Sequence, residues 1–241
     1  PRVRRQRQMC IRDRGKSSVE AVVKAMTTDE KIRLLTGAGE VTEDLLVAIG
    51  ETDKIVPGAA GTTYPIPRLG IPAIVMADGP AGLRIDSCRD KSDKTYYCTA
   101  FPVATLLAST WNTNLVQQVG NAMGNEVLEY GCDVLLAPAL NIHRNPLCGR
   151  NFEYYSEDPV LAGKMAAAYI NGVQSRGTGT CLKHFAVNNQ ETNRNNNDSR
   201  LTQRPLRELY LKCFEIAVKE SQPWSVTVSY THLTLPTNSR V

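Results

Sequence analysis

Residues 132–159 constrain the fold of this chain most strongly, because they pass from an apolar run into a polar loop within a few positions. Residues 134–140 have the composition of a buried strand. The loop that follows carries His143, Arg144, Asn145, Arg150, Asn151 and Glu153. In α/β proteins, ligands bind outside the carboxyl ends of parallel strands, which is where such a loop would lie. Asp158 and Pro159 then supply an N-cap and a favoured first helical residue, so the stretch predicts a strand, a site-forming loop and a helix.

Strand and helix patterns alternate along most of the chain. We expect strands at residues 71–77, 100–102, 134–140, 180–187 and 224–228, and longer helices at 112–131, 159–176 and 202–221. Two short helices between residues 17 and 37 open on the capping-box patterns Ser17-x-x-Glu20 and Thr27-x-x-Glu30. Residues 38–68 are rich in Gly and Pro and indicate a long irregular loop. This alternation favours a parallel sheet covered by helices.

The absence of phosphate-binding motifs helps to choose between the α/β architectures. No predicted strand is followed by GxGxxG or GxxxxGK[ST], so a doubly wound nucleotide-binding sheet is the less favoured choice. A complete (β/α)8 barrel takes about 250 residues, and this chain spends its 241 residues on five predicted strands and a long leading segment. We therefore predict an α/β fold, a partial TIM-type (β/α)8 barrel with about the first five strands present.

The net charge of +4 comes from the N-terminus and not from the body of the chain. Residues 1–14 hold six arginines and one aspartate. These arginines have no aromatic residues among them and no periodicity, so we expect no nucleic-acid partner. Residues 1–16 and 229–241 resemble translated adapter sequence, and we interpret them as disordered or non-native tails. Residues 17–228 then form one incomplete barrel domain.

Other sequence features bear on location and cofactors. No apolar run is long enough to cross a bilayer, and no apolar segment follows the arginines as a secretory signal requires. We expect no membrane association and a cytoplasmic location. The seven cysteines show no paired spacing, which favours reduced thiols over a disulfide framework or a zinc site. We expect neither a metal nor a cofactor.

Four polar clusters fall where a barrel would have its active face: Asp78 with Arg84, Arg150 with Glu153, Lys183 with His184, and Arg194. For the first two clusters a structural interpretation, as a turn cap or an ion pair, weighs as much as a functional one. Lys183 and His184 point more strongly to function. Adjacent strand residues point to opposite faces, so Lys183 and His184 cannot both be buried in one apolar core in the middle of a strand. We therefore expect them near the end of their strand. Cationic donors beside a carboxylate suit a polyol ligand.

Three segments, MADGPAGLR, APALNIHRNPLCGRNFEYYSEDP and LKHFAVNNQETNR, resemble the N-terminal barrel domain of glycoside hydrolase family 3, in its β-glucosidase branch. The resemblance covers about residues 26–228. It implies a β-glucoside or oligosaccharide substrate and retaining hydrolysis of terminal non-reducing β-D-glucosyl, or related β-glycosyl, residues. It also implies that Asp78 binds hydroxyls of the non-reducing sugar, with Arg84 supporting that end of the pocket. The remaining substrate-binding residues that it implies are Arg150, Lys183, His184 and Arg194.

The same resemblance leaves the bond-breaking residues unassigned. The family nucleophile is an aspartate at the end of a later barrel strand, in a motif like TDW, and the acid/base comes from a following domain. Neither TDW nor SDW occurs in this sequence. We therefore assign no catalytic residue to the chain. We expect it to be inactive alone and to need the missing C-terminal part of its own chain as a partner.

Two other functions remain open. A Schiff-base aldolase could use Lys183, since barrel lyases place a lysine on an interior strand. A non-catalytic sugar-binding module could use Asp78, Arg150 and Lys183 without any chemistry.

Overall fold

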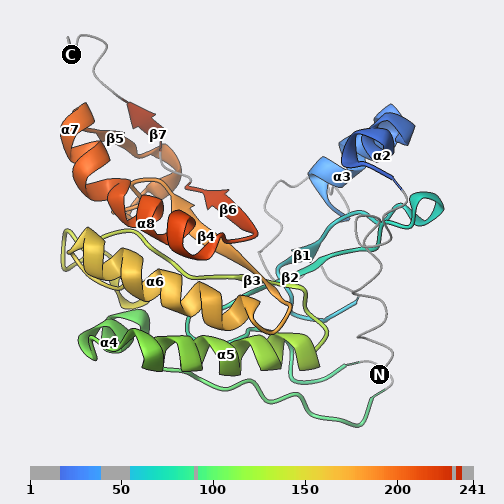
Figure 1. Cartoon of the computed structure of the whole chain (residues 1–241), viewed down its shortest axis with the longest axis horizontal. Helices are drawn as coiled ribbons and strands as arrows, with labels where there is room; N and C mark the ends of the chain where they lie inside the picture. Colours follow the sequence, from blue (N-terminus) through green and yellow to red (C-terminus); the bar gives the residue numbers. More distant parts are fainter. Residues whose placement is uncertain (1–16, 39–54, 90–91, 230–231, 235–241) are drawn as a thin grey trace. The chain divides into compact units, whose positions relative to one another are not determined.

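The computed structural model describes residues 17–38, 55–89, 92–229 and 232–234 (Figure 1). The predicted tail 1–16 and residues 39–54 of the predicted loop lie outside the described residues. The chain divides into two compact units. The first takes its described residues from Pro1–Asp78, Arg84–Tyr97 and Glu129–Val134, and the second from Gly79–Leu83, Cys98–Leu128 and Leu135–Val241.

Five strands form the main sheet, in the order β1-β2-β3-β4-β6. Their bounds are β1 Gly61–Thr62, β2 Val75–Asp78, β3 Val134–Leu136, β4 Gly179–Phe185 and β6 Ser225–Val228. β4 and β6 are parallel, whereas β1 pairs with β2 antiparallel. The predicted α/β class and the number of strands are confirmed. The all-parallel expectation is wrong at β1, a two-residue strand inside the segment predicted to be a loop.

The first unit begins with two capped helices. α2 (Val19–Ala25) has Ser18 as its N-cap, with the side chain accepting a hydrogen bond from the amide of Ala21. The predicted cap at Ser17 is therefore wrong by one residue. α3 (Thr28–Thr36) has the predicted capping box, because Thr27 and Glu30 bond each other's backbone amides.

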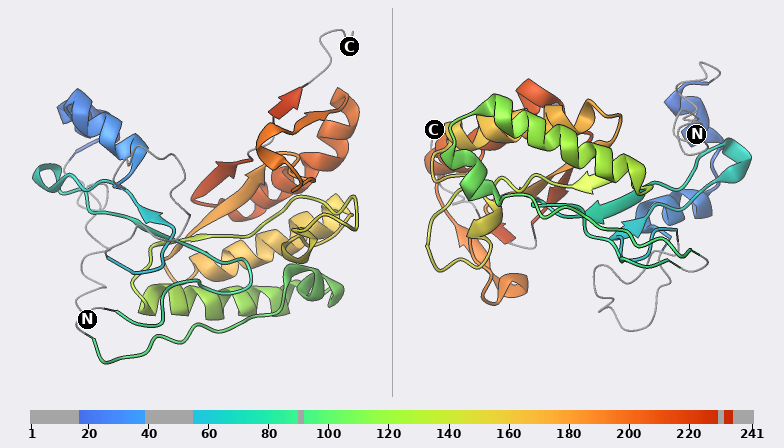
Figure 2. Two further views of the ribbon diagram at one scale, coloured as in Figure 1. Left: turned by 180° about the vertical axis from the view of Figure 1, so that it is seen from behind. Right: turned by 90° about the horizontal axis from the view of Figure 1, so that it is seen from below.

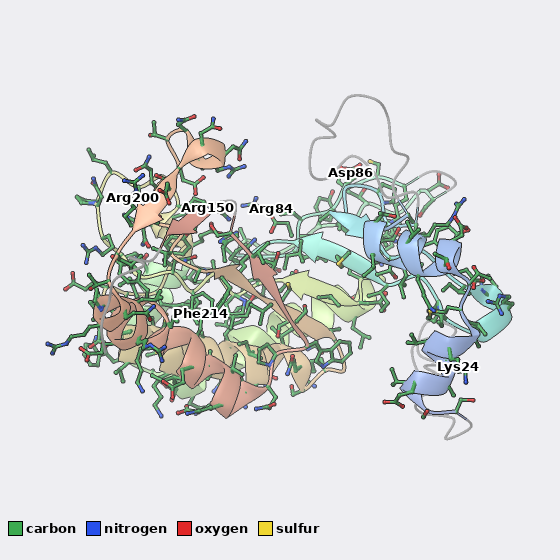
Figure 3. The ribbon with its side chains drawn as sticks, turned by 90° about the horizontal axis from the view of Figure 1, so that it is seen from above. Lys24, Arg84, Asp86, Arg150, Arg200 and Phe214 are labelled. Carbon is green, nitrogen blue, oxygen red and sulfur yellow. The ribbon has the colours of Figure 1, made fainter. Side chains whose placement is uncertain are left out.

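The second unit stacks its helices closely. α5 (Thr113–Glu129), α6 (Pro159–Gln174) and α8 (Lys212–Ser221) lie side by side in Figure 1 and in the left view of Figure 2. A β-carbon on Gly120 would approach the carbonyl oxygen of Tyr169 to 2.4 Å, so α5 and α6 are in backbone contact at this glycine. Phe185 at the end of β4 packs edge-on against Phe214 of α8 (labelled in Figure 3), with 5.3 Å between ring centroids.

Two local predictions in the second unit are wrong. Residues 100–102 are not a strand: Pro102 has no amide hydrogen to donate to a ladder, and Phe101 donates to the carbonyl of Ala81. The chain continues into α4 (Ala104–Ser109), which was not predicted. The predicted helix 202–221 is broken into α7 (Gln203–Pro205), the π-helical turn η4 (Leu206–Tyr210) and α8.

The chain after β4 forms a second, smaller sheet. η3 (Arg194–Asn196) leads into β5 (Asp198–Arg200), which pairs parallel with β7 (His232–Thr234). β7 lies within the segment predicted to be a tail, and the boundary at residue 229 stays a prediction. Among the described residues, no helix combines the length and the apolarity that a membrane crossing requires.

Candidate functional site

Lys183 and His184 lie close to the end of β4, as predicted, and both are buried, with 5% and 7% of their surface exposed. The neighbouring segment fixes the backbone of β4 here. The amide of Leu140 donates to the carbonyl of Lys183 at 2.7 Å, and the amide of Lys183 donates to the carbonyl of Pro138 at 3.0 Å. The peptide bond between Lys183 and His184 is cis.

His184 is held from both sides of its backbone by Asn141. The side-chain oxygen of Asn141 accepts from the amide of His184 at 3.1 Å, and its nitrogen donates to the carbonyl of His184 at 3.0 Å. Sequence reasoning missed Asn141. The available signal was an amide side chain placed directly after an apolar strand, where it must find buried partners.

The imidazole of His184 is neutral. Burial, and after it the charges of Arg150, Lys183 and Arg194, lowers the pKa of His184 from 6.5 to about 2. Within the described part of the chain, its buried Nδ1 has no hydrogen-bond partner. A neutral imidazole has one donor and one acceptor nitrogen, so this ring can make a directional hydrogen bond to a ligand hydroxyl. The charges of Arg150, Lys183 and Arg194 all act on this imidazole, and these three residues with His184 make up the cluster around His184.

Arg150 is anchored by a buried carboxylate. Its Nε donates to Oε1 of Glu153, at the end of η2 (Asn151–Glu153), and only 3% of the Glu153 side chain is exposed. Burial acts to lower the pKa of Arg150, but the hydrogen bond and the charge of Glu153 outweigh it and raise that pKa. Arg150 is therefore a permanent cation with a fixed orientation (it is labelled in Figure 3).

Arg194 has an equivalent partner on the loop after β4. Its Nη1 lies 3.0 Å from Oε2 of Glu191, and Oε1 of Glu191 accepts from the amide nitrogen of Asn188 at 3.2 Å. Asn188 also donates to the hydroxyl of Tyr154 at 3.0 Å. Glu191, Asn188 and Tyr154 were not singled out from the sequence, because their contacts join separate loops.

Asp78 and Arg84 form a second group, in the first unit. Asp78 ends β2, its Oδ2 lies 3.6 Å from Nη1 of Arg84, and the Arg84 amide donates to its carbonyl at 2.9 Å. The turn between them depends on Gly79, whose φ is +134° and whose β-carbon would collide with the carbonyl of Gly82 at 1.6 Å. Arg84 is mostly exposed, with its side chain open to a ligand.

The second unit also carries a groove of about 910 Å³. It lies between the loop 142–146, residues 157–159 and Leu209, and its lining includes none of the predicted site residues. Within the described residues, no group of three or more His, Cys, Asp or Glu side chains could hold a metal ion.

Comparisons with known proteins give consistent matches. Residues 58–239 match the family described as the glycosyl hydrolase family 3 N terminal domain. The chain is 43% identical over 218 residues to thermostable beta-glucosidase B of Acetivibrio thermocellus, covering 89% of this chain and 26% of that protein. It is 48% identical over 168 residues to an exo-alpha-(1->6)-L-arabinopyranosidase of Bifidobacterium longum, covering 68% of this chain and 22% of that protein.

A solved structure gives the same result. The structure of beta-glucosidase 3B from Thermotoga neapolitana in complex with glucose matches with a TM-score of 0.82 and 56% identity, covering 89% of this chain and 29% of that chain. Together with the five-stranded sheet, this match confirms the predicted partial barrel. The chain spans about a quarter of the length of the curated relatives it matches.

Proposed function

This chain belongs to glycosyl hydrolase family 3, whose N-terminal domain it matches over residues 58–239, and on this premise we propose that it supplies the sugar-recognition part of a β-glucosidase. The complete enzyme hydrolyses terminal non-reducing β-D-glucosyl, or related β-glycosyl, residues by the retaining mechanism. A β-glucoside or oligosaccharide is its substrate. The names of relatives such as beta-glucosidase B of Acetivibrio thermocellus support this assignment.

The observation that carries the proposal is the cluster of cations around a neutral His184. Arg150, Lys183 and Arg194 all act on this buried imidazole, and each arginine is paired with its own carboxylate, Glu153 or Glu191. Sugar hydroxyls accept charge-assisted hydrogen bonds from such donors, while the neutral imidazole offers one further directional bond. Because the carboxylates balance much of the positive charge, an uncharged sugar fits this cluster better than an anion does.

Asp78 and Arg84 have a separate part in the proposal. A carboxylate accepts hydrogen bonds from two neighbouring hydroxyls at once, and the Asp78 side chain retains 30% exposure despite the nearby Arg84. Asp78 binds hydroxyls of the non-reducing sugar, and Arg84 supports that carboxylate from the other side of the turn.

Bond cleavage is not assigned to any carboxylate of this chain. Retaining hydrolysis requires a nucleophilic carboxylate and an acid/base residue. Glu153 and Glu191 are each paired with an arginine of the cluster, so we assign neither of them as the nucleophile or the acid/base. The nucleophile and the acid/base belong to the remainder of the enzyme, and the 241-residue chain alone does not hydrolyse β-glucosides.

Calorimetric titration of the chain with glucose tests the proposal. We expect saturable binding that Lys183→Ala abolishes. The matched control Lys164→Ala, which removes an exposed lysine paired with Glu220 on the outside of α6, leaves binding unchanged. Glucose binding that is insensitive to Lys183→Ala, or turnover of an aryl β-glucoside by the chain alone, would contradict it.

Borohydride trapping separates this proposal from the aldolase alternative. Incubation with a carbonyl substrate and borohydride leaves no adduct on Lys183 if the residue acts only as a hydrogen-bond donor. A reduced adduct at this lysine, found by mass spectrometry, would favour the lyase instead.

A further inference from the structure

The two carboxylate oxygens of Glu191 have different partners. Oε1 accepts a hydrogen bond from Asn188 Nδ2 at 3.2 Å, and Oε2 accepts one from Arg194 Nη1 at 3.0 Å. We propose that Glu191 is a positioning residue, which fixes the guanidinium of Arg194 within the cluster around His184 and does not itself bind the sugar. The expected effect of Glu191 on sugar affinity rests on the function proposed above. The claim that Glu191 orients Arg194 is independent of that function.

The residues that anchor Glu191 on one side are buried. Asn188 is buried, and it exchanges two hydrogen bonds with the fully buried Tyr154: its Nδ2 donates to the tyrosine hydroxyl at 3.0 Å, and that hydroxyl donates to its carbonyl at 3.1 Å. The chain of contacts Tyr154–Asn188–Glu191–Arg194 therefore runs from the core to a partly exposed guanidinium. A side chain fixed at its buried end can hold an exposed partner in one orientation.

The charges around Arg194 explain why it needs an anchor. Arg150 and Lys183 carry the same charge and act on the same imidazole as Arg194 does. With 39% of its side chain exposed, Arg194 can turn away from these like charges into solvent unless an anion holds it. Glu191 places an anion 3.0 Å from Nη1 of Arg194, and its charge also acts on Arg150.

A comparison with Glu153 supports a positioning role over a catalytic one. Glu153 pairs with the arginine three residues before it, and Glu191 pairs with the arginine three residues after it. Each carboxylate thus forms an ion pair with one arginine of the cluster. Since both oxygens of Glu191 already accept hydrogen bonds, this residue is better suited to orienting Arg194 than to attacking a sugar.

The first experiment measures the guanidinium directly in the ligand-free chain. NMR spectra of the arginine side chains, with the Arg194 signal assigned by its loss in Arg194→Lys, report rotation of each guanidinium. In Glu191→Ala we expect the Arg194 rotation to become at least about tenfold faster, in line with the loss of a charge-assisted hydrogen bond. The matched control Glu208→Ala removes an exposed carboxylate paired with Arg204 at 3.0 Å and leaves the Arg194 signal unchanged.

The second experiment measures glucose affinity. Glu191→Ala and Arg194→Ala each weaken binding about tenfold, and the double variant is no weaker than either single variant, because both changes remove the same interaction. Glu191→Gln restores part of the affinity, since its amide oxygen can still accept from one donor. If Glu191 had a merely structural role, Glu191→Ala would instead lower the melting temperature, and the affinity losses of Glu191→Ala and Arg194→Ala would add in the double variant.

The outcomes separate the two proposals. If the unaltered chain binds no glucose, the proposed function fails, and the guanidinium spectra still decide whether Glu191 holds Arg194. If glucose binds and Lys183→Ala abolishes it, while Glu191→Ala alters neither the Arg194 spectrum nor the affinity, the positioning role alone is overturned.

Discussion

Glu153 lies almost fully buried against Arg150, three residues earlier in the same loop, and this ion pair holds Arg150 in place beside His184. Removing one member of a buried pair leaves the other charge uncompensated. We expect Glu153→Ala to lower the free energy of unfolding by about 3–5 kcal/mol, as measured by urea denaturation. The exposed pair Arg204–Glu208 is the control, and Glu208→Ala changes stability by about 1 kcal/mol or less. If the two variants lower the free energy of unfolding equally, the buried pair contributes no more to stability than the exposed one.

The depressed pKa of His184 predicts a pH dependence. Burial, then the neighbouring cations, lower that pKa to about 2, whereas the unfolded chain binds the proton near its ordinary value of 6.5. The unfolded state therefore holds more protons between these values, so the free energy of unfolding falls as pH drops below 6.5 and this contribution is complete above it. In His184→Gln the slope between pH 5 and pH 6.5 becomes shallower. Identical slopes for the two proteins would rule the prediction out.

Asn141 is expected to be as important to the site as the residues that face the ligand. Asn141→Ala removes both side-chain bonds to the backbone of His184 and leaves a buried amide and carbonyl without partners. We expect a loss of about 1–3 kcal/mol in stability together with weaker glucose binding. Asn114→Ala, on the exposed surface of α5, changes neither quantity. Normal stability of Asn141→Ala would mean that solvent or a shifted backbone satisfies those groups.

The contact of α5 with α6 predicts a sharp difference between two glycines. In Gly120→Ala the new β-carbon meets the Tyr169 carbonyl at 2.4 Å, so the helices must separate. We expect a destabilisation of about 1–3 kcal/mol, the usual cost of overpacking. Gly149→Ala is the control, because its β-carbon would meet no atom within 4 Å. Thermal denaturation of both variants compares them, and equal melting temperatures would contradict the close packing.

Several elements could be predicted because their signals are local. Thr27 and Glu30 form the predicted capping box of α3, and Asp158 caps α6, as its position before Pro159 predicts. Lys183 and His184 could be assigned to the end of a strand because adjacent strand residues point to opposite faces, and two polar side chains fit an apolar segment only near its end. In each case, the deciding interaction lies within a few residues along the chain.

The features that were missed depend on contacts between distant residues. Asn141 and His184 are separated by 43 positions, and Tyr154 and Asn188 by 34, so no local pattern reveals either pair. β1 was missed because Gly61-Thr62 forms a strand only by pairing with β2. Residues 100–102 have the composition of a strand, but they pair with no neighbouring strand in the described part of the chain, and Pro102 has no amide hydrogen to donate. Composition alone does not show whether a partner strand is present.

The three-residue spacing within both arginine clamps has a consequence for how such loops can change. Arg150 with Glu153, and Glu191 with Arg194, are each encoded in four consecutive positions. Insertions or deletions on either side of a clamp move the arginine and its counter-charge together and leave the pair intact. Loops of this kind can therefore vary in length and reshape their surroundings while both arginines keep their counter-charges.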